Sequence, residues 1–172
     1  MVHLPGYDAW KLAIPPEYEI TPEEERRLEA IDDLQRARAA ATQRFLALTE
    51  VIKAEAGVTG HIIRKSLTGR VNWTTPTVIE APEGRTRRQL YIVAHECAHV
   101  ALKHYKARIP SYLKEHEAEL WAHAALCRHG VPVPRQETER AKRYVARKIR
   151  NARKVGLKHL SPAAAAFARK KL

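Results

Sequence analysis

The chain has 172 residues, an apolar fraction of 45% and a formal net charge of +12. This size suits one domain with a single core, and the composition excludes wholesale disorder. No apolar run approaches the roughly 20 residues of a membrane span, and the first residues lack the pattern of a secretory signal. Two cysteines, Cys97 and Cys127, are too few for a disulfide scaffold. These features predict a cytoplasmic protein without a membrane span.

The first predicted element is an irregular N-terminal arm over residues 1–20, which is rich in proline. A long helix is expected next, because Thr21-Pro22-Glu23-Glu24 combines an N-cap threonine, a first-turn proline and a capping-box glutamate. Apolar residues then recur at steps of three and four from Leu28 to Ile52, and Gly57 marks the expected end of the helix.

A small antiparallel sheet is expected between residues 61 and 82. Segments 61–64 and 70–73 flank a Thr68-Gly69 turn signal, and segment 77–80 has the composition of a third short strand. Pro76 precedes this third strand, which suggests that the strand lies at an edge of the sheet.

Four further helices follow the sheet. Thr86 opens the second helix with another capping box, and this helix is expected to run to about Tyr105. The third helix opens at Ser111, the fourth spans about residues 137–155, and a short fifth follows Ser161. The order predicts an α+β domain over residues 21–134, with a helical C-terminal extension, residues 135–172, packed on the same domain.

The chemistry-bearing motif is His95-Glu96-Cys97-Ala98-His99, in the middle of the second predicted helix. Two histidines four residues apart lie on one helical face, so both imidazoles can reach one metal ion. Glu96 lies where it can polarise a metal-bound water, whose pKa zinc lowers to about 7. The motif predicts a zinc (Zn2+) hydrolase with His95 and His99 as ligands and Glu96 as the general base.

A catalytic zinc site needs a third protein ligand beside an open position. His104 is a poor candidate, because the glycine and the histidine that the metzincin pattern requires are absent. On the third helix, Glu115 and Glu119 lie four residues apart and share a face, whereas Glu117 points away from that pair. One acid of the pair can bind zinc while the other accepts the free ring N–H of a ligand histidine.

A family resemblance rests on the histidine motif and on Glu115-x-x-Ala118-Glu119-x-Trp121-Ala122-x-x-Ala125-Leu126. Together they resemble the ImmA/IrrE metallopeptidases of the gluzincin branch, over about residues 60–130. The resemblance implies a minimal gluzincin-like fold, Glu115 as the third zinc ligand and Glu119 as the acid that supports a histidine. The chain departs from the family at Glu119, which is usually Asn or Asp, and at Trp121, which is usually Phe.

The same resemblance implies a zinc-dependent metallopeptidase that hydrolyses peptide bonds of an intracellular protein, such as a DNA-binding regulator. A gluzincin substrate pairs with an edge strand, for which the segment Pro76–Ala81 is the candidate. An alternative alignment to the SprT-like, DNA-associated proteases makes His116 the third ligand, and Glu117 stays a further alternative. Two other hypotheses are a nucleic-acid-associated module of a mobile element with a structural or vestigial zinc site, and a non-peptidase zinc hydrolase.

The C-terminal extension is strongly basic. Residues 135–172 hold thirteen Lys and Arg residues against Glu137 and Glu139, a net charge of +11, which leaves about +1 for the other residues. The fourth helix combines an apolar stripe, expected to pack on the domain, with basic faces. These faces predict non-specific contact with nucleic acid. An acidic partner protein, an anionic membrane surface and a solvated charged face are the alternatives.

Overall fold

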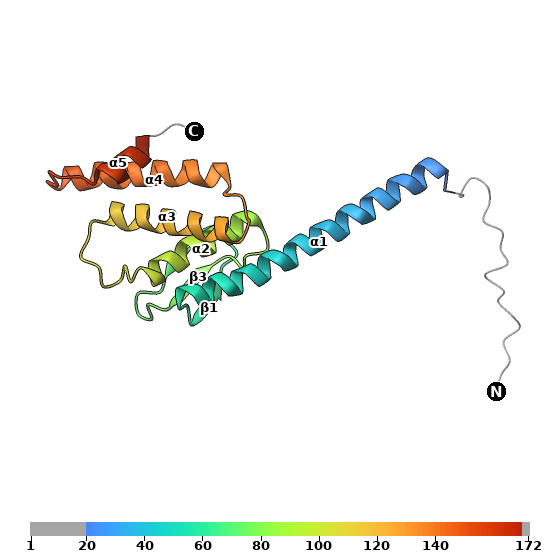
Figure 1. The fold of residues 1–172 in the computed structure, drawn as a ribbon, viewed down its shortest axis with the longest axis horizontal. Coiled ribbons are helices and arrows are strands. Elements are labelled where there is room, and N and C mark those ends of the chain that lie inside the picture. Colours follow the sequence, from blue (N-terminus) through green and yellow to red (C-terminus); the bar gives the residue numbers. More distant parts are fainter. Residues whose placement is uncertain (1–19, 170–172) are drawn as a thin grey trace, which may run out of the picture. The chain divides into compact units, whose positions relative to one another are not determined.

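The computed structural model of the protein describes residues 20–169, so the expected N-terminal arm lies, apart from Ile20, outside the described part of the chain (Figure 1). The chain divides into two compact units between Ala39 and Ala40. Residues 20–169 form five helices and one three-stranded mixed sheet, an α+β fold that is mostly helical.

The first helix, α1 (Pro22–Ala56), begins at the predicted capping box. The Glu24 N–H donates to Thr21 Oγ1 at 3.2 Å, and the Thr21 N–H donates to Glu24 Oε2 at 2.9 Å. The helix ends before Gly57, whose φ of +73° lies in the region that favours glycine. In the second unit, the last turns of α1 bury Ile52 in the main core.

The sheet is mixed, so the prediction of an antiparallel sheet was wrong. The strand order is β1-β3-β2, in which β1 (Gly60–Ile63) pairs parallel with β3 (Val78–Ala81) and β2 (Arg70–Val71) pairs antiparallel with it. The first two strands therefore form no hairpin, and β3 is the inner strand rather than the predicted edge. The most buried strand takes the centre, because Ile79 and Ala81 are inaccessible to solvent and their backbone groups need partners on both sides.

The next two helices begin where the sequence predicts. Thr86 caps α2 (Arg87–Ala101), and its hydroxyl accepts the Gln89 N–H at 3.2 Å. This helix ends four residues before the predicted position, in a turn where Lys103 has a φ of +52°. After the turn, α3 (Ser111–Arg128) carries the chain back along α2.

The last two helices, α4 (Arg135–Lys154) and α5 (Pro162–Arg169), share a second core with α3. In it, Val145 and Ile149 of α4 pack with Tyr112 of α3. The predicted apolar stripe of the fourth helix is thus buried at these positions, although Val155 at its end is 86% exposed.

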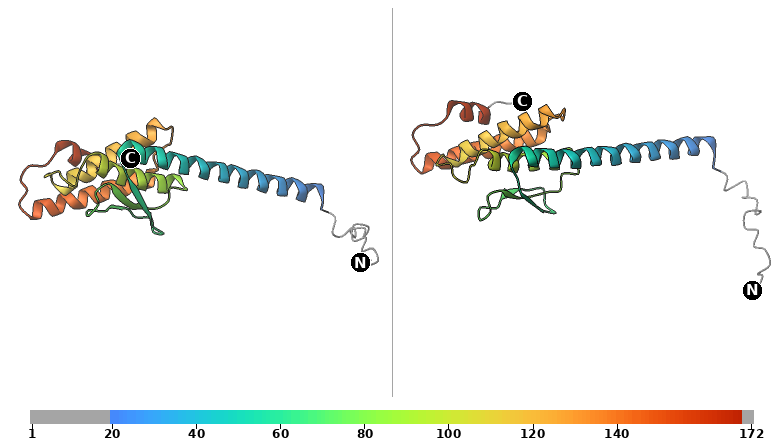
Figure 2. Two further views of the ribbon diagram at one scale, coloured as in Figure 1. Left: turned by 90° about the horizontal axis from the view of Figure 1, so that it is seen from below. Right: turned by 60° about the horizontal axis from the view of Figure 1, so that its bottom comes forward.

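The second unit is layered. Helix α2 lies between the sheet and α3, and α4 and α5 lie against α3 (Figure 1, Figure 2). The main core lies where α2 meets the sheet, α3 and the end of α1. Within residues 20–169, no helix combines the length and the apolarity that a membrane crossing requires.

Candidate metal centre

The two histidines of the motif and one acid of α3 meet between α2 and α3. One nitrogen of His95, one nitrogen of His99 and one carboxylate oxygen of Glu115 all lie within 4.8 Å of one another. The Glu115 Oε2 atom lies 3.4 Å from His95 Nε2 and 3.7 Å from His99 Nε2. Both separations are long for a hydrogen bond.

These separations match those of atoms that share a metal ion. Ligand atoms placed 2.0–2.1 Å from a tetrahedral zinc ion lie about 3.3–3.4 Å apart. Two imidazoles and a carboxylate are also a donor set that zinc accepts in catalytic sites, where a fourth position stays open. The residues present therefore fit a zinc ion, which His95, His99 and Glu115 would hold.

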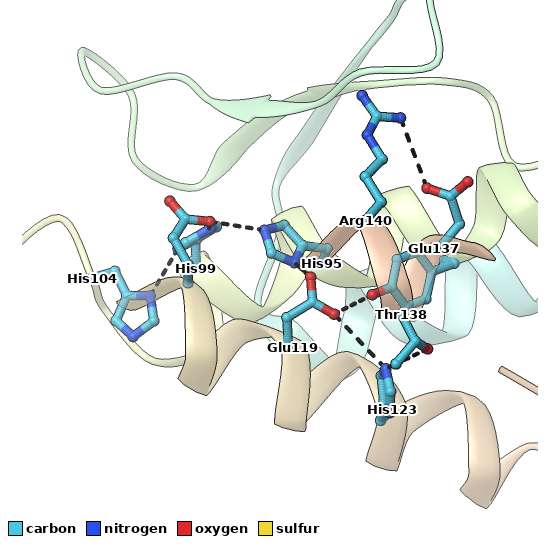
Figure 3. A network of polar contacts seen from close by, with 10 residues as sticks. His95, His99, His104, Glu119, His123, Glu137, Thr138 and Arg140 are labelled. Atoms are coloured by element: carbon cyan, nitrogen blue, oxygen red, sulfur yellow. Dashed lines mark hydrogen bonds and ion pairs between the residues drawn. The ribbon is translucent and has the colours of Figure 1, made fainter. Parts of the chain in front are cut away.

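The far side of the His95 ring faces a second acid of α3. His95 Nδ1 lies 3.0 Å from Glu119 Oε1, although the N–H direction is not aligned for a hydrogen bond, and this buried nitrogen has no other partner among the described residues. Glu119 in turn accepts a hydrogen bond from the Tyr91 hydroxyl, and its Oε2 lies 3.8 Å from His123 Nε2 (Figure 3). Glu119 is therefore close enough to orient the His95 ring if His95 binds a metal, once the two groups align.

The far side of the His99 ring faces another imidazole. His99 Nδ1 lies 2.8 Å from His104 Nδ1 (Figure 3). His104 Nε2 lies 3.1 Å from Glu117 Oε2. If His99 keeps Nε2 free for a metal, its Nδ1–H donates to His104, and His104 donates its own Nε2–H to Glu117. In this series of hydrogen bonds from His99 through His104 to Glu117, each donor then faces an acceptor.

The turn after α2 creates the His104 contact. The positive φ of Lys103 turns the chain back, the His104 N–H donates to the His99 carbonyl at 3.0 Å, and Lys114 Nζ donates to the His104 carbonyl at 2.6 Å. As a result His104 is only 1% exposed, although it lies outside any helix.

Glu96 lies beside the ligands and under the segment that leads into β2. Its side chain is 6% exposed and lines the same cleft as His95 and His99. A Cβ atom at Gly69 would lie 2.6 Å from Glu96 Oε1 and 2.4 Å from its Cγ. A side chain at position 69 would force the Glu96 side chain to move, so the close backbone at Gly69 limits where the Glu96 carboxylate can lie.

The electrostatics of the cluster differ between its two histidines. Burial opposes the charged form of His95, but the carboxylates of Glu115 and Glu119 outweigh it and raise the pKa of His95 well above its ordinary value. Without a metal, burial raises the pKa of Glu96 to about 7, and the charges of Glu115 and Glu119 add to this effect while His95 opposes it. Burial also lowers the pKa of His99, which favours the neutral imidazole that a metal requires. Burial alone would raise the pKa of Glu115, but His95 and His99 hold it well below its ordinary value.

A cleft of about 870 Å³ contains the cluster. Its floor is formed by α2 and α3, and its sides are formed by the segment from Leu67 to Trp73 and by one face of α4. The edge strand β2 belongs to this segment, so the strand that borders the cleft is β2 and not the predicted Pro76–Ala81.

The structure brings the sequence-predicted residues His95, Glu96, His99 and Glu115 together. The two alternative third ligands lie elsewhere: the His116 ring packs against Phe167 of α5, with ring centroids 5.1 Å apart, and Glu117 contacts His104.

Sequence reasoning missed three contributors to the site: the supporting role of His104, the contact of Gly69 with Glu96, and the place of α4 beside the cluster. For His104, the only signal in the sequence was a third histidine five residues after His99.

The chain matches no model of a protein family, no curated protein and no solved structure. The likeness to the ImmA/IrrE metallopeptidases therefore rests on the residues that carry it.

Proposed function

We propose that the chain is a zinc-dependent metallopeptidase that hydrolyses peptide bonds of a protein substrate. The observation that carries the proposal is the convergence of His95, His99 and Glu115, whose ligand atoms lie within 4.8 Å of one another, with Glu96 in the same cleft. Zinc in such a site acts as a Lewis acid toward a carbonyl oxygen and acidifies a water molecule.

Glu96 supplies the proton transfers that hydrolysis requires. As the attacking water adds its oxygen to the peptide carbonyl carbon, the Glu96 carboxylate takes the water proton. When the C–N bond breaks, Glu96 passes that proton to the leaving amine, so that an acid and an amine are the products. The close backbone at Gly69 limits the positions that the carboxylate can take during both transfers.

The surrounding residues favour a hydrolytic over a structural metal site. A structural zinc site is closed by four protein ligands, whereas the described residues offer three at this point.

Two histidines and one carboxylate also hold Fe(II) in oxygenases. Glu96, a carboxylate beside the open side of the cluster, favours hydrolysis, because an oxygenase needs no base at this position.

The edge strand β2 supports a peptide as the substrate. An extended peptide can add to the free side of an edge strand through backbone hydrogen bonds, and β2 borders the cleft. The ImmA/IrrE resemblance adds an intracellular DNA-binding regulator as the class of substrate.

The test uses full-length protein stripped of metal by a chelator and then reloaded with zinc or with Fe(II). Each sample is incubated with an unbiased peptide library, and new termini are identified by mass spectrometry. We expect cleavage by the zinc-loaded protein and none by the stripped protein. Cleavage without metal, or no cleavage by zinc-loaded protein that holds one zinc ion per chain, would contradict the proposal.

A further inference from the structure

A stripe of arginines lines the cleft beside the metal centre. Helix α4 places four exposed arginines at steps of three and four residues, so that they share one face of the helix and extend over about 15 Å. The members of this arginine stripe are Arg140, Arg143, Arg147 and Arg150. All four line the cleft that contains His95 and Glu96, as does Lys148.

The charge of the stripe is left largely without acidic partners. Arg140 lies 3.8 Å from Glu137, but within residues 20–169 no carboxylate pairs with Arg143, Arg147 or Arg150. Arg147 instead lies over the Tyr144 ring, 4.9 Å from its centroid. By contrast, the buried Lys142 on another face of α4 is paired with Glu139 at 2.9 Å. The helix thus pairs its buried cation, Lys142, with an acid, whereas most of the arginine stripe is available to bind acidic groups that enter the cleft.

We propose that the arginine stripe selects polypeptide substrates that carry Asp or Glu side chains near the scissile bond. The inference rests on the proposed peptidase function and names its substrate class. A peptide extended along β2 crosses the cleft between segment 67–73 and α4. Its carboxylates form ion pairs with the stripe, while Leu67 and Trp73, both exposed in the same cleft, offer apolar contacts to other side chains.

The floor of the cleft favours an acidic peptide over a nucleic acid strand. Three carboxylates line it, those of Glu96, Glu115 and Glu119, and Glu137 lines the α4 side. A nucleic acid strand carries a phosphate at every nucleotide and would bring some of them against these acids. A peptide carries negative charge only at its Asp and Glu positions, so it can face the stripe with acids and the floor with neutral backbone.

The experiment measures binding and cleavage of three labelled peptides of equal length and equal central sequence. Their flanks carry Asp and Glu, Asn and Gln, or Lys and Arg. Binding is followed by fluorescence anisotropy on zinc-loaded Glu96→Gln protein, and cleavage is followed on the zinc-loaded parent. Two variants are compared in each background: Arg143→Glu with Arg147→Glu in the stripe, and Arg153→Glu with Lys158→Glu outside the cleft, which change the net charge equally.

We expect the acidic peptide to bind about tenfold more tightly than the neutral one, because exposed ion pairs contribute a few-fold each. The stripe variant removes this preference and favours the basic peptide, a gain that misfolding cannot produce. The outer variant keeps the preference of the parent, and added salt weakens it. Equal binding of the three peptides, or equal effects of the two variants, would overturn the inference.

The outcomes separate this inference from the proposed function. Cleavage of all three peptides at equal rates leaves the peptidase in place and overturns the acidic selection. Acidic preference in binding without any cleavage overturns the peptidase and keeps the selection. A single-stranded oligonucleotide that binds more tightly than the acidic peptide, and that loses binding in the stripe variant, would make the stripe a nucleic acid surface instead.

Discussion

The floor and the α4 side of the cleft are built in opposite ways. On the floor, the two histidines of the motif are half-buried, and each has a neighbour on its far side, Glu119 beside His95 and His104 beside His99. On the α4 side, the arginines are exposed, and Arg143 and Arg147 have no acidic partner within residues 20–169. A floor fixed by internal contacts suits chemistry, which needs exact positions, whereas long exposed side chains suit selection among substrates.

The largest expected effect removes a ligand from the floor. Glu115→Ala should weaken zinc binding by more than about a hundredfold, since loss of a supporting residue alone costs roughly 10–100-fold. His116→Ala is the matched control, because its ring packs against Phe167 and not against the cluster. Zinc affinity is measured by competition with a chelating dye. Loss of zinc in His116→Ala, with retention in Glu115→Ala, would move the third ligand to His116.

Gly69→Ala tests whether the floor must hold Glu96 in one place. The added Cβ would displace the Glu96 side chain, so we expect hydrolysis to fall by about a hundredfold with zinc affinity unchanged. Thr68→Ala, one residue earlier in the same segment, controls for a general disturbance of this segment. Equal loss of activity in both variants would mean that Gly69 does not act through Glu96.

The two supports of the histidines can be compared directly. Glu119→Ala and His104→Ala should each weaken zinc binding by roughly tenfold or more, because each removes the group that orients a ligand ring. His123→Ala, which lies 3.8 Å from Glu119, should change the affinity by less than about threefold. Unchanged affinity in His104→Ala would reduce the His99–His104–Glu117 chain to a packing contact.

The smallest expected effect concerns the link between the floor and α4. Arg88 of α2 pairs with the buried Glu137 of α4 at 2.7 Å, and the Arg88 side chain is 44% exposed. A double-mutant cycle of Arg88→Ala and Glu137→Ala should give a coupling of about 0.5–1 kcal/mol in the free energy of unfolding. Urea titration measures it, and a coupling near zero would mean that the pair does not hold the two parts together.

The helices could be predicted because their signals are local. The capping residues Thr21 and Thr86 and the stop at Gly57 act within one turn of the chain, and the structure confirms all three. Strand pairing depends on residues far apart in the sequence. The Thr68-Gly69 signal suggested a hairpin, but β1 pairs with β3, whose buried Ile79 and Ala81 need two neighbours.

The residues of the candidate site also fall into two groups, those that local spacing in the sequence predicts and those that depend on distant parts of the chain. His95, Glu96 and His99 follow from helical spacing, and Glu115 and Glu119 share a face for the same reason. The roles of His104 and Gly69 depend on a turn at Lys103 and on the approach of a distant segment, which no spacing reveals. The basic composition of α4 was visible in the sequence, but only the packing of Val145 and Ile149 on α3 directs its arginines to the cleft.

The most direct test of the peptidase proposal measures zinc content and hydrolysis together in the parent and in Glu96→Gln. This substitution keeps the size of the side chain and removes the base, which contributes about 10²–10⁴-fold in rate. We predict one zinc ion per chain in both proteins, cleavage of the peptide library by the parent, and loss of cleavage in the variant. Comparable cleavage by zinc-loaded Glu96→Gln, or a parent that takes up no zinc, would contradict the account.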